Sequence, residues 1–142
     1  MTTRQLTTFY ADERYFGIDV MKVQEVLRYQ EMTRAPLAPA EIRGLINLRG
    51  QIVVALDLRR RLGLPDRAEG SLPMNVVVRS DDASISLLVD EIGDVLEVDE
   101  DLFEEPPETL RTGREFVRGA YKLDGQLLLE LDMEKVIDIT SG

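Results

Sequence analysis

One sixteen-residue pattern occurs twice in this chain, and the repeat constrains the possible folds more than any other feature. Residues 43–58 match residues 118–133, 75 positions later, at seven identical positions. A weaker match relates residues 20–27 to residues 89–96 at an offset of 69. Both copies are rich in strand-forming residues, and a unit of about 70 residues is long enough for one small β-barrel. The sequence therefore predicts an internal duplication of a barrel-like unit.

The duplication predicts the fold class and the division of the chain. We expect a mainly β protein of two SH3-like, five-stranded β-barrel subdomains with short helices. Subdomain 1 would cover about residues 14–72 and subdomain 2 about residues 73–135, within one domain of 142 residues. Terminal strands could cross between them. Because barrels of this size bury little area each, we expect them to share a third apolar interface.

Hydrophobic periodicity and turn residues predict the local elements. Alternation predicts a hairpin within residues 6–20, and Val20, Val23 and Leu27 at helical spacing predict a short helix over residues 20–27. Asp57 and Gly63 would begin and end a short helix at 58–62. Further predicted strands are residues 51–56, 75–79, 85–89, 95–98, 117–122 and 126–131, with an acidic loop of at most one helical turn over 99–114.

The composition excludes most catalytic chemistry. The chain contains no His and no Cys, so histidine acid–base catalysis, thiolate nucleophiles and phosphohistidine formation are impossible from this chain alone. Residues 1–71 carry a net charge of +2 and residues 72–142 a net charge of −12. An acidic protein of this kind is a poor candidate for binding nucleic acid or anionic lipid. With no apolar run near the length of a membrane span and no apolar signal core, we expect a cytoplasmic protein.

The duplicated aspartates raise one enzymatic alternative. Asp57 and Asp132 could form a carboxylate dyad of the aspartic-protease type, making the chain a hydrolase. Neither aspartate has the glycine-bearing turn that such a dyad needs, and each is well placed to cap the short helix that follows. The helix-cap interpretation is therefore favoured.

Two charged segments could also suggest ligands. The acidic run could suggest Ca²⁺ but lacks the spacing of an EF-hand, so a solvated acidic face is favoured; its members are Glu97, Asp99, Glu100, Asp101, Glu104, Glu105 and Glu108. Arg59, Arg60 and Arg61 could contact phosphate, but at the end of a short helix they are better explained as complementing its dipole. No cofactor and no metal site is predicted.

The segment from Asn47 to Gly50 is a candidate recognition site. Asn47 and Gly50 suit a tight turn before the strand at 51–56. A turn does not require Arg49, for which Glu25 is a plausible ion-pair partner. Because an exposed ion pair contributes only about 0–1 kcal/mol, such a pair is more useful for orienting a partner than for stability.

The same segments resemble the CheW family of chemotaxis coupling proteins. The match includes residues 15–26, residues 42–50 with the strand that follows, residues 89–96, and the stretch from Arg118 onward. It extends over roughly residues 6–139. The resemblance implies a fold of two SH3-like barrels, in agreement with the repeat.

The resemblance also implies a function and partners. CheW-like proteins are non-enzymatic adaptors that join the cytoplasmic tips of methyl-accepting chemotaxis receptors to the histidine kinase CheA in membrane-associated arrays. By correspondence with the family, the receptor-binding residues would be Val23, Glu25, Arg49, Val76, Ile92 and Val95. The kinase regulatory domain would dock near Leu27, Ile42 and Leu45. Structural turns and caps would be formed by Gly44, Asn47, Gly50, Asp57 and Asp132.

Two further alternatives stay open at this point. The chain could serve a chemosensory pathway for twitching or biofilm formation, with the same fold. It could also be a generic SH3-like module that binds extended peptides, in which case Arg49 would matter no more than any other surface residue. We expect the isolated chain to be a monomer.

Overall fold

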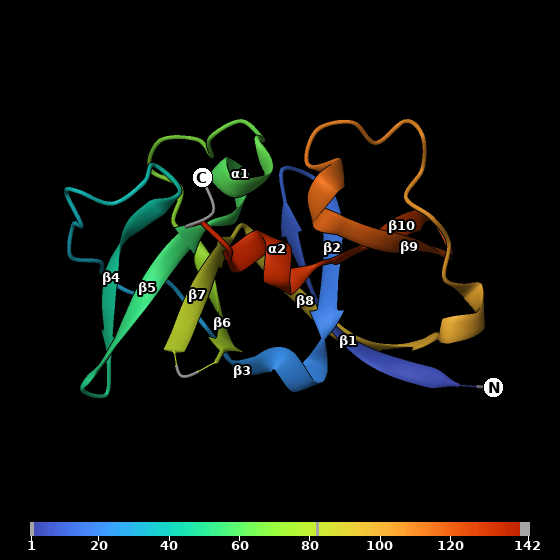
Figure 1. Ribbon diagram of the computed structural model, residues 1–142, viewed down its shortest axis with the longest axis horizontal. Helices are drawn as coiled ribbons and strands as arrows, with labels where there is room; N and C mark the ends of the chain where they lie inside the picture. The colour runs from blue at the N-terminus through green and yellow to red at the C-terminus, as the bar shows by residue number, and fades with distance from the viewer. Residues whose placement is uncertain (1, 82, 140–142) are drawn as a thin grey trace.

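The computed structural model describes residues 2–81 and 83–139, and within them ten strands form two five-stranded sheets (Figure 1). The first sheet has the spatial order β8 (Glu91–Asp99), β1 (Thr3–Ala11), β2 (Arg14–Asp19), β10 (Gln126–Leu131), β9 (Val117–Leu123). The second has the order β3 (Val23–Leu27), β6 (Met74–Ser80), β7 (Ala83–Val89), β5 (Gln51–Asp57), β4 (Ile42–Leu48). The short helices are α1 (Leu58–Leu62) and α2 (Met133–Ile137), with 3₁₀ turns η1 (Val20–Lys22), η2 (Glu100–Leu102) and η3 (Arg114–Phe116). The predicted mainly β fold is confirmed.

The two sheets have the same topology but mix the two sequence repeats. In each sheet an antiparallel hairpin, β1–β2 or β6–β7, pairs in parallel with a strand of a second hairpin, β9–β10 or β4–β5. The first sheet contains residues 3–19 and 91–131, and the second contains residues 23–89. Each sheet thus combines the leading hairpin of one repeat with the three later strands of the other. The division at residues 72/73 stays a prediction about the repeats.

Each sheet closes toward a barrel through the segment that follows its edge strand. Thr33, after β3, bridges to Leu45 on β4, and Glu104, after β8, bridges to Ala120 on β9. The repeated glycines lie beside these bridges: a Cβ atom on Gly44 or Gly119 would stand 2.6 Å from the carbonyl oxygen of Thr33 or Glu104, respectively. The Arg-Gly pair of the repeat is therefore explained by barrel closure, and Gly44 lies within a strand rather than in a turn.

Three hydrophobic clusters fill the molecule. One lies inside the second barrel around Ile46 and Val53, and another lies inside the first barrel around Leu6 and Leu128. The largest cluster draws on both sheets and both helices, and we call it the shared core. Its buried members include Phe9, Phe16, Leu56, Leu58, Val76, Leu87, Leu129, Leu131 and Val136. The predicted third apolar interface is confirmed.

The predicted helix at residues 20–27 is wrong. Val20–Lys22 forms one 3₁₀ turn and Val23–Leu27 is an edge strand paired with β6. Side-chain burial alternates along β3, as a strand requires. The helix at residues 58–62, its cap at Asp57 and its left-handed Gly63 are as predicted, and the segment after β8 contains only the short turn η2 before η3.

Candidate functional site

The residues predicted to line the receptor groove include members of β3 and β8, which are edge strands of the two sheets. Val23 on β3 and Ile92 on β8 are partly buried and pack against that core. Val76, on β6 beside β3, is fully buried in the shared core. Because its side chain has no exposed surface, Val76 cannot line an open groove; it supports the floor from below.

Three exposed apolar side chains lie on β8, on β3 and in the turn before β3. Val95 on β8 is 53% exposed, as a binding residue requires. Met21, in the turn η1, is 87% exposed, and Val26 on β3 is also exposed. Large apolar side chains left exposed to solvent are a feature of interaction surfaces. Sequence reasoning missed Met21 and Val26 because it assigned them to an amphipathic helix.

The structure contains the predicted ion pair between Glu25 and Arg49. Glu25 is on β3, and Arg49 is at the tip of the β4–β5 hairpin, where the Arg49 side chain is 70% exposed. Asn47 accepts a hydrogen bond from the Gly50 amide at 2.9 Å, which holds the turn. Both central turn residues have positive φ, 51° at Arg49 and 86° at Gly50. Glycine adopts this conformation readily, whereas arginine does so at a cost.

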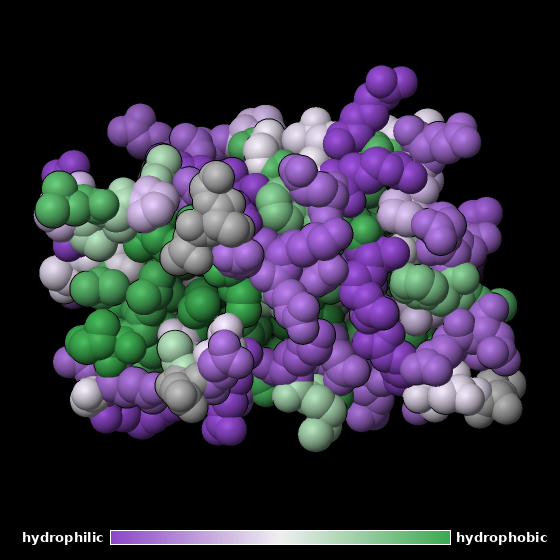
Figure 2. Space-filling view, in the orientation of Figure 1, coloured by the Kyte–Doolittle hydropathy of each residue, from purple (hydrophilic) through white to green (hydrophobic). Residues whose placement is uncertain are grey.

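The residues predicted for kinase docking lie in different environments. Leu27 packs into the core of the second barrel and Ile42 packs against the shared core, both partly buried. Leu45 on β4 is paired with Val54 on β5, and Val54 is in turn paired with Ile85 on β7. With the 59% exposed Ile52, these form an outer apolar patch, defined as Leu45, Ile52, Val54 and Ile85. Ile85 also packs against the shared core, so the patch continues from the edge of that core. Figure 2 shows hydrophobic residues gathered over β4, β5 and β7 at the left.

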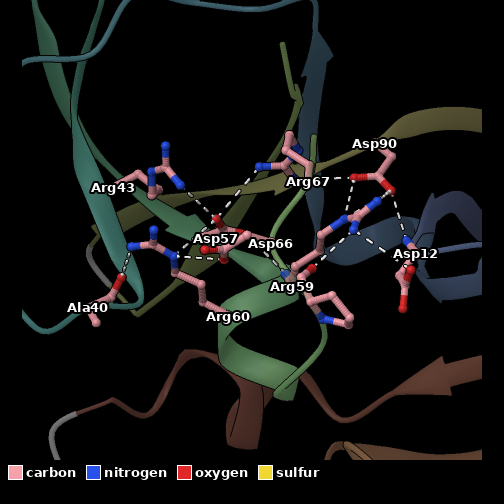
Figure 3. A network of polar contacts seen from close by, with 10 residues as sticks. Asp12, Ala40, Arg43, Asp57, Arg59, Arg60, Asp66, Arg67 and Asp90 are labelled. Atoms are coloured by element: carbon pink, nitrogen blue, oxygen red, sulfur yellow. Dashed lines mark hydrogen bonds and ion pairs between the residues drawn. The ribbon is translucent and has the colours of Figure 1, made fainter. Parts of the chain in front are cut away.

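A network of arginines and aspartates lies beside α1 (Figure 3). Asp57 is buried, accepts a hydrogen bond from the Arg59 amide, and is approached by the guanidinium groups of Arg43, Arg60 and Arg67 at 3.3, 3.9 and 3.6 Å. A buried carboxylate is stable only with such partners. Asp57 therefore caps helix α1 and also provides the negative charge with which these arginines pair.

Asp90 is the second centre of this network and joins the two sheets. Its carboxylate accepts hydrogen bonds from Arg59 at 2.6 Å, from the Asp12 amide at 2.8 Å and from Arg67 at 3.3 Å. Burial pushes the pKa of Asp90 upward, but the hydrogen bonds from Arg59 and the Asp12 amide outweigh it, so the pKa lies below the ordinary value. Because Asp12 is at the β1–β2 turn and Arg59 is on α1, the contacts tie the first sheet to the second.

The three arginines of α1 have separate roles that sequence reasoning missed. Arg59 binds Asp90, and Arg60 binds Asp66 and the carbonyl oxygen of Ala40. Arg61 donates to carbonyl oxygens of α2 rather than complementing its own helix. The consecutive arginines were the only available signal, and which neighbours each would reach depends on the tertiary fold.

The geometry does not support a carboxylate dyad. Asp132 accepts a hydrogen bond from the Lys135 amide at 3.3 Å, as a helix cap, while Asp57 is occupied by arginines. Among the described contacts no hydrogen bond joins the two aspartates. Within the described residues, no group of three or more carboxylates is arranged to hold a metal ion, and no helix is long and apolar enough to span a membrane.

Comparisons with known proteins agree with the geometry. The family model of the CheW-like domain matches residues 5–141. The chemotaxis protein CheW of Treponema pallidum is 30% identical over 93% of this chain and 81% of its own length. The Bacillus subtilis chemotaxis protein CheW is 29% identical over 99% of this chain and 91% of its own length. The crystal structure of the scaffolding protein TtCheW from Thermoanaerobacter tengcongensis matches with a TM-score of 0.88 at 27% identity, covering 99% and 97% of the two chains.

The paired barrels, the shared core and the exposed apolar surfaces define a protein of the small β-barrel interaction class. The family match extends over nearly the whole chain. The chain belongs to the CheW family of chemotaxis scaffold proteins.

Proposed function

We propose that this chain is a non-enzymatic adaptor that couples methyl-accepting chemotaxis receptors to the histidine kinase CheA and thereby controls kinase activity. Its place would be the cytoplasm, at membrane receptor arrays, with the isolated chain a monomer. The observation that carries the proposal is the Glu25–Arg49 pair, whose arginine is exposed, in a CheW-family fold with exposed apolar side chains on β3 and β8. An apolar groove with one oriented charged pair suits an amphipathic helical hairpin, since apolar contact gives affinity and the charges set the register.

The receptor tip would lie along β3 and β8. Val23, Ile92 and Val95 would contact its apolar face, with Met21 and Val26 extending the contact. Arg49 would orient the tip from the hairpin. Its exposure and the small stability of a solvated ion pair both favour a role in recognition over one in folding.

The kinase regulatory domain would dock on the second barrel at the outer apolar patch. Leu45 belongs to both the sequence-predicted set and the patch, and Ile52 is its most exposed member at 59%. Leu27 and Ile42 would act from beneath, because each packs into a core and supports the strand that carries the surface. The patch has the apolar centre expected of a protein interface.

The receptor assignment is tested by pull-down with a receptor-tip fragment. Arg49→Glu should reduce binding at least tenfold, the size of loss expected for an oriented interface charge. Arg111→Glu is the matched control, because Arg111 is exposed and has no side-chain contact among those described. Exchanging the charges with Glu25→Arg and Arg49→Glu together should restore part of the binding if the pair acts as a unit. Unchanged binding by Arg49→Glu would overturn the receptor assignment.

The kinase assignment is tested separately with the regulatory domain of CheA. Ile52→Lys should weaken that complex while leaving receptor binding unchanged. Leu72→Lys serves as the control, because Leu72 is equally exposed, at 62%, but lies in the loop after α1, outside the patch. Equal loss in both variants would contradict docking at the patch.

A further inference from the structure

Arg61 makes the densest set of contacts between the two helices. Its guanidinium donates hydrogen bonds to the carbonyl oxygens of Lys135, Val136 and Asp138 in the last turn of α2, at 2.8, 2.8 and 2.7 Å. It also stacks over the ring of Phe116, with 4.8 Å between the guanidinium carbon and the ring centroid. Carbonyl groups at a helix C-terminus lack intrahelical partners and favour a cation. A residue of α1, on the second barrel, thus caps α2, on the first.

The Arg61 side chain is largely enclosed by neighbouring residues where it contacts α2. The Arg61 side chain is only 17% exposed. Its guanidinium also forms an ion pair with Glu41, with 3.6 Å between Nη1 of Arg61 and Oε2 of Glu41. Its planar fork of donors suits several acceptors at once, which a flexible ammonium group matches less well. A partly buried arginine with several hydrogen bonds restricts the relative positions of the elements that it joins.

The two repeats are not equivalent at this position. At the repeat offset of 75, Arg61 corresponds to Val136 and Arg59 corresponds to Glu134. In the part of the chain that the structure describes, α2 therefore has no counterpart of the two arginines with which α1 reaches the first barrel. Among the described residues, the arginine contacts that join the barrels through the helices therefore come from α1 and not from α2.

The region beside α2 differs from the region beside α1 because these arginines are absent from α2. Where Arg59 fills the space between α1, the β1–β2 turn and Asp90, the corresponding region beside α2 is an open cleft of about 600 Å³. Its lining includes Asp81 of the β6–β7 turn and Met133, Glu134 and Ile137 of α2. Asp81 corresponds to Asp12 at an offset of 69, but no arginine of α2 stands beside it. The shared core joins the two barrels, and the arginines of α1 add polar contacts between them that α2 does not match among the described residues.

We propose that Arg61 is a positioning residue that sets the orientation of one barrel relative to the other, and with it the separation of β3 and β8 across the groove. Because β3 and β8 belong to different sheets, a rotation of one barrel relative to the other changes the distance between these strands. The link to partner binding rests on the proposed function. The link to barrel orientation does not, because it follows from the contacts of the chain alone.

The test measures the distance across the groove in the isolated chain. Because the natural sequence has no Cys, spin labels at Val26→Cys and Glu97→Cys, both exposed, report only that distance. Arg61→Met keeps an aliphatic stem over Phe116 and removes every donor. It should broaden and shift the distance distribution relative to the parent, and unlabelled Arg61→Met should weaken receptor-tip binding about tenfold. Arg60→Gln is the matched control, since Arg60 has the same charge on the same helix but contacts Asp57, Asp66 and Ala40, which flank the second barrel.

The outcomes separate the two proposals. An unchanged distance distribution in a folded Arg61→Met variant would overturn the positioning role, whatever the receptor does. A changed distribution with no receptor binding by the parent protein would support the positioning role and overturn the proposed function. If Arg61→Met does not fold, Arg61→Gln, which can reach one carbonyl oxygen at most, provides the same measurement with the same decisive result.

Discussion

Gly44 lies so close to Thr33 that a Cβ atom on residue 44 would stand 2.6 Å from the Thr33 carbonyl oxygen. Backbone cannot move aside as the end of a side chain can, so an added methyl group must separate the bridge between Thr33 and Leu45. The same relationship holds between Gly119 and Glu104 in the other barrel. The repeated glycine therefore follows from how each barrel closes.

Gly44→Ala and Gly119→Ala should each lower the free energy of unfolding by about 2–3 kcal/mol. Gly17→Ala is the comparison, because its nearest obstacle is a side-chain methyl group of Leu128 at 3.2 Å, which can shift. Urea unfolding measures all three. A cost at Gly44 no greater than at Gly17 would contradict the closure argument.

Arg49→Asn should make the protein more stable and less able to bind its receptor. Asn is favoured at a positive-φ turn position, and relief of the strain at Arg49 should gain about 0.5–1 kcal/mol. The lost ion pair with Glu25 offsets only part of this, because Arg49 is 70% exposed. Thermal unfolding and receptor pull-down on the same sample check both effects, and a less stable variant with full binding would contradict both.

Asp90→Asn should flatten the dependence of stability on pH in acid. The folded-state pKa of Asp90 lies below the unfolded-state value of about 3.9, because Arg59 and the Asp12 amide favour the carboxylate despite its burial. Its stabilising contribution is therefore complete above about pH 4 and is lost as the pH falls through the folded-state pKa. Urea unfolding at pH 7 and pH 3 should show a smaller difference for Asp90→Asn than for the parent. Asp101→Asn, at an exposed position, should behave as the parent does.

Asp57→Ala should destabilise the protein more than Asp132→Ala. Loss of the Asp132 cap should cost about 1 kcal/mol. Loss of Asp57 should cost about 3 kcal/mol or more, because Arg43 would lose its acidic partner and the largely buried Arg67 would keep only Asp90. Chemical denaturation ranks the two variants, and equal costs would show that Asp57 is only a helix cap. Retained partner binding by Asp57→Asn with Asp132→Asn would also exclude a required dyad.

Local sequence signals predicted most of the elements. The strand at β5, the β9–β10 hairpin, the caps at Asp57 and Asp132, and the left-handed Gly63 each depend on a few neighbouring residues, whereas strand β4 was not predicted. The repeat then supplied the number of barrels. The shared core followed from size alone, since two barrels this small need a common interface.

Features that depend on distant pairing were missed. The residues Val20, Val23 and Leu27 have helical spacing. Val23 nevertheless pairs with Val78 and Val26 pairs with Val76, so residues 23–27 form an edge strand. A crossing of terminal strands between the subdomains was expected, but which strands pair leaves no local signal, because β1 pairs with β8 about 90 residues later. Val76 was placed in the groove, but its burial shows that it supports the surface without forming it.

The most direct test of the adaptor function is a three-component co-purification. A tagged CheA regulatory domain is incubated with a receptor-tip fragment, with and without this chain. Retention of the receptor fragment only when the chain is present, and its loss with Arg49→Glu, is the result we predict. Retention of the receptor fragment to the same extent without the chain, or failure of the chain to bind either partner, would contradict the function proposed for it.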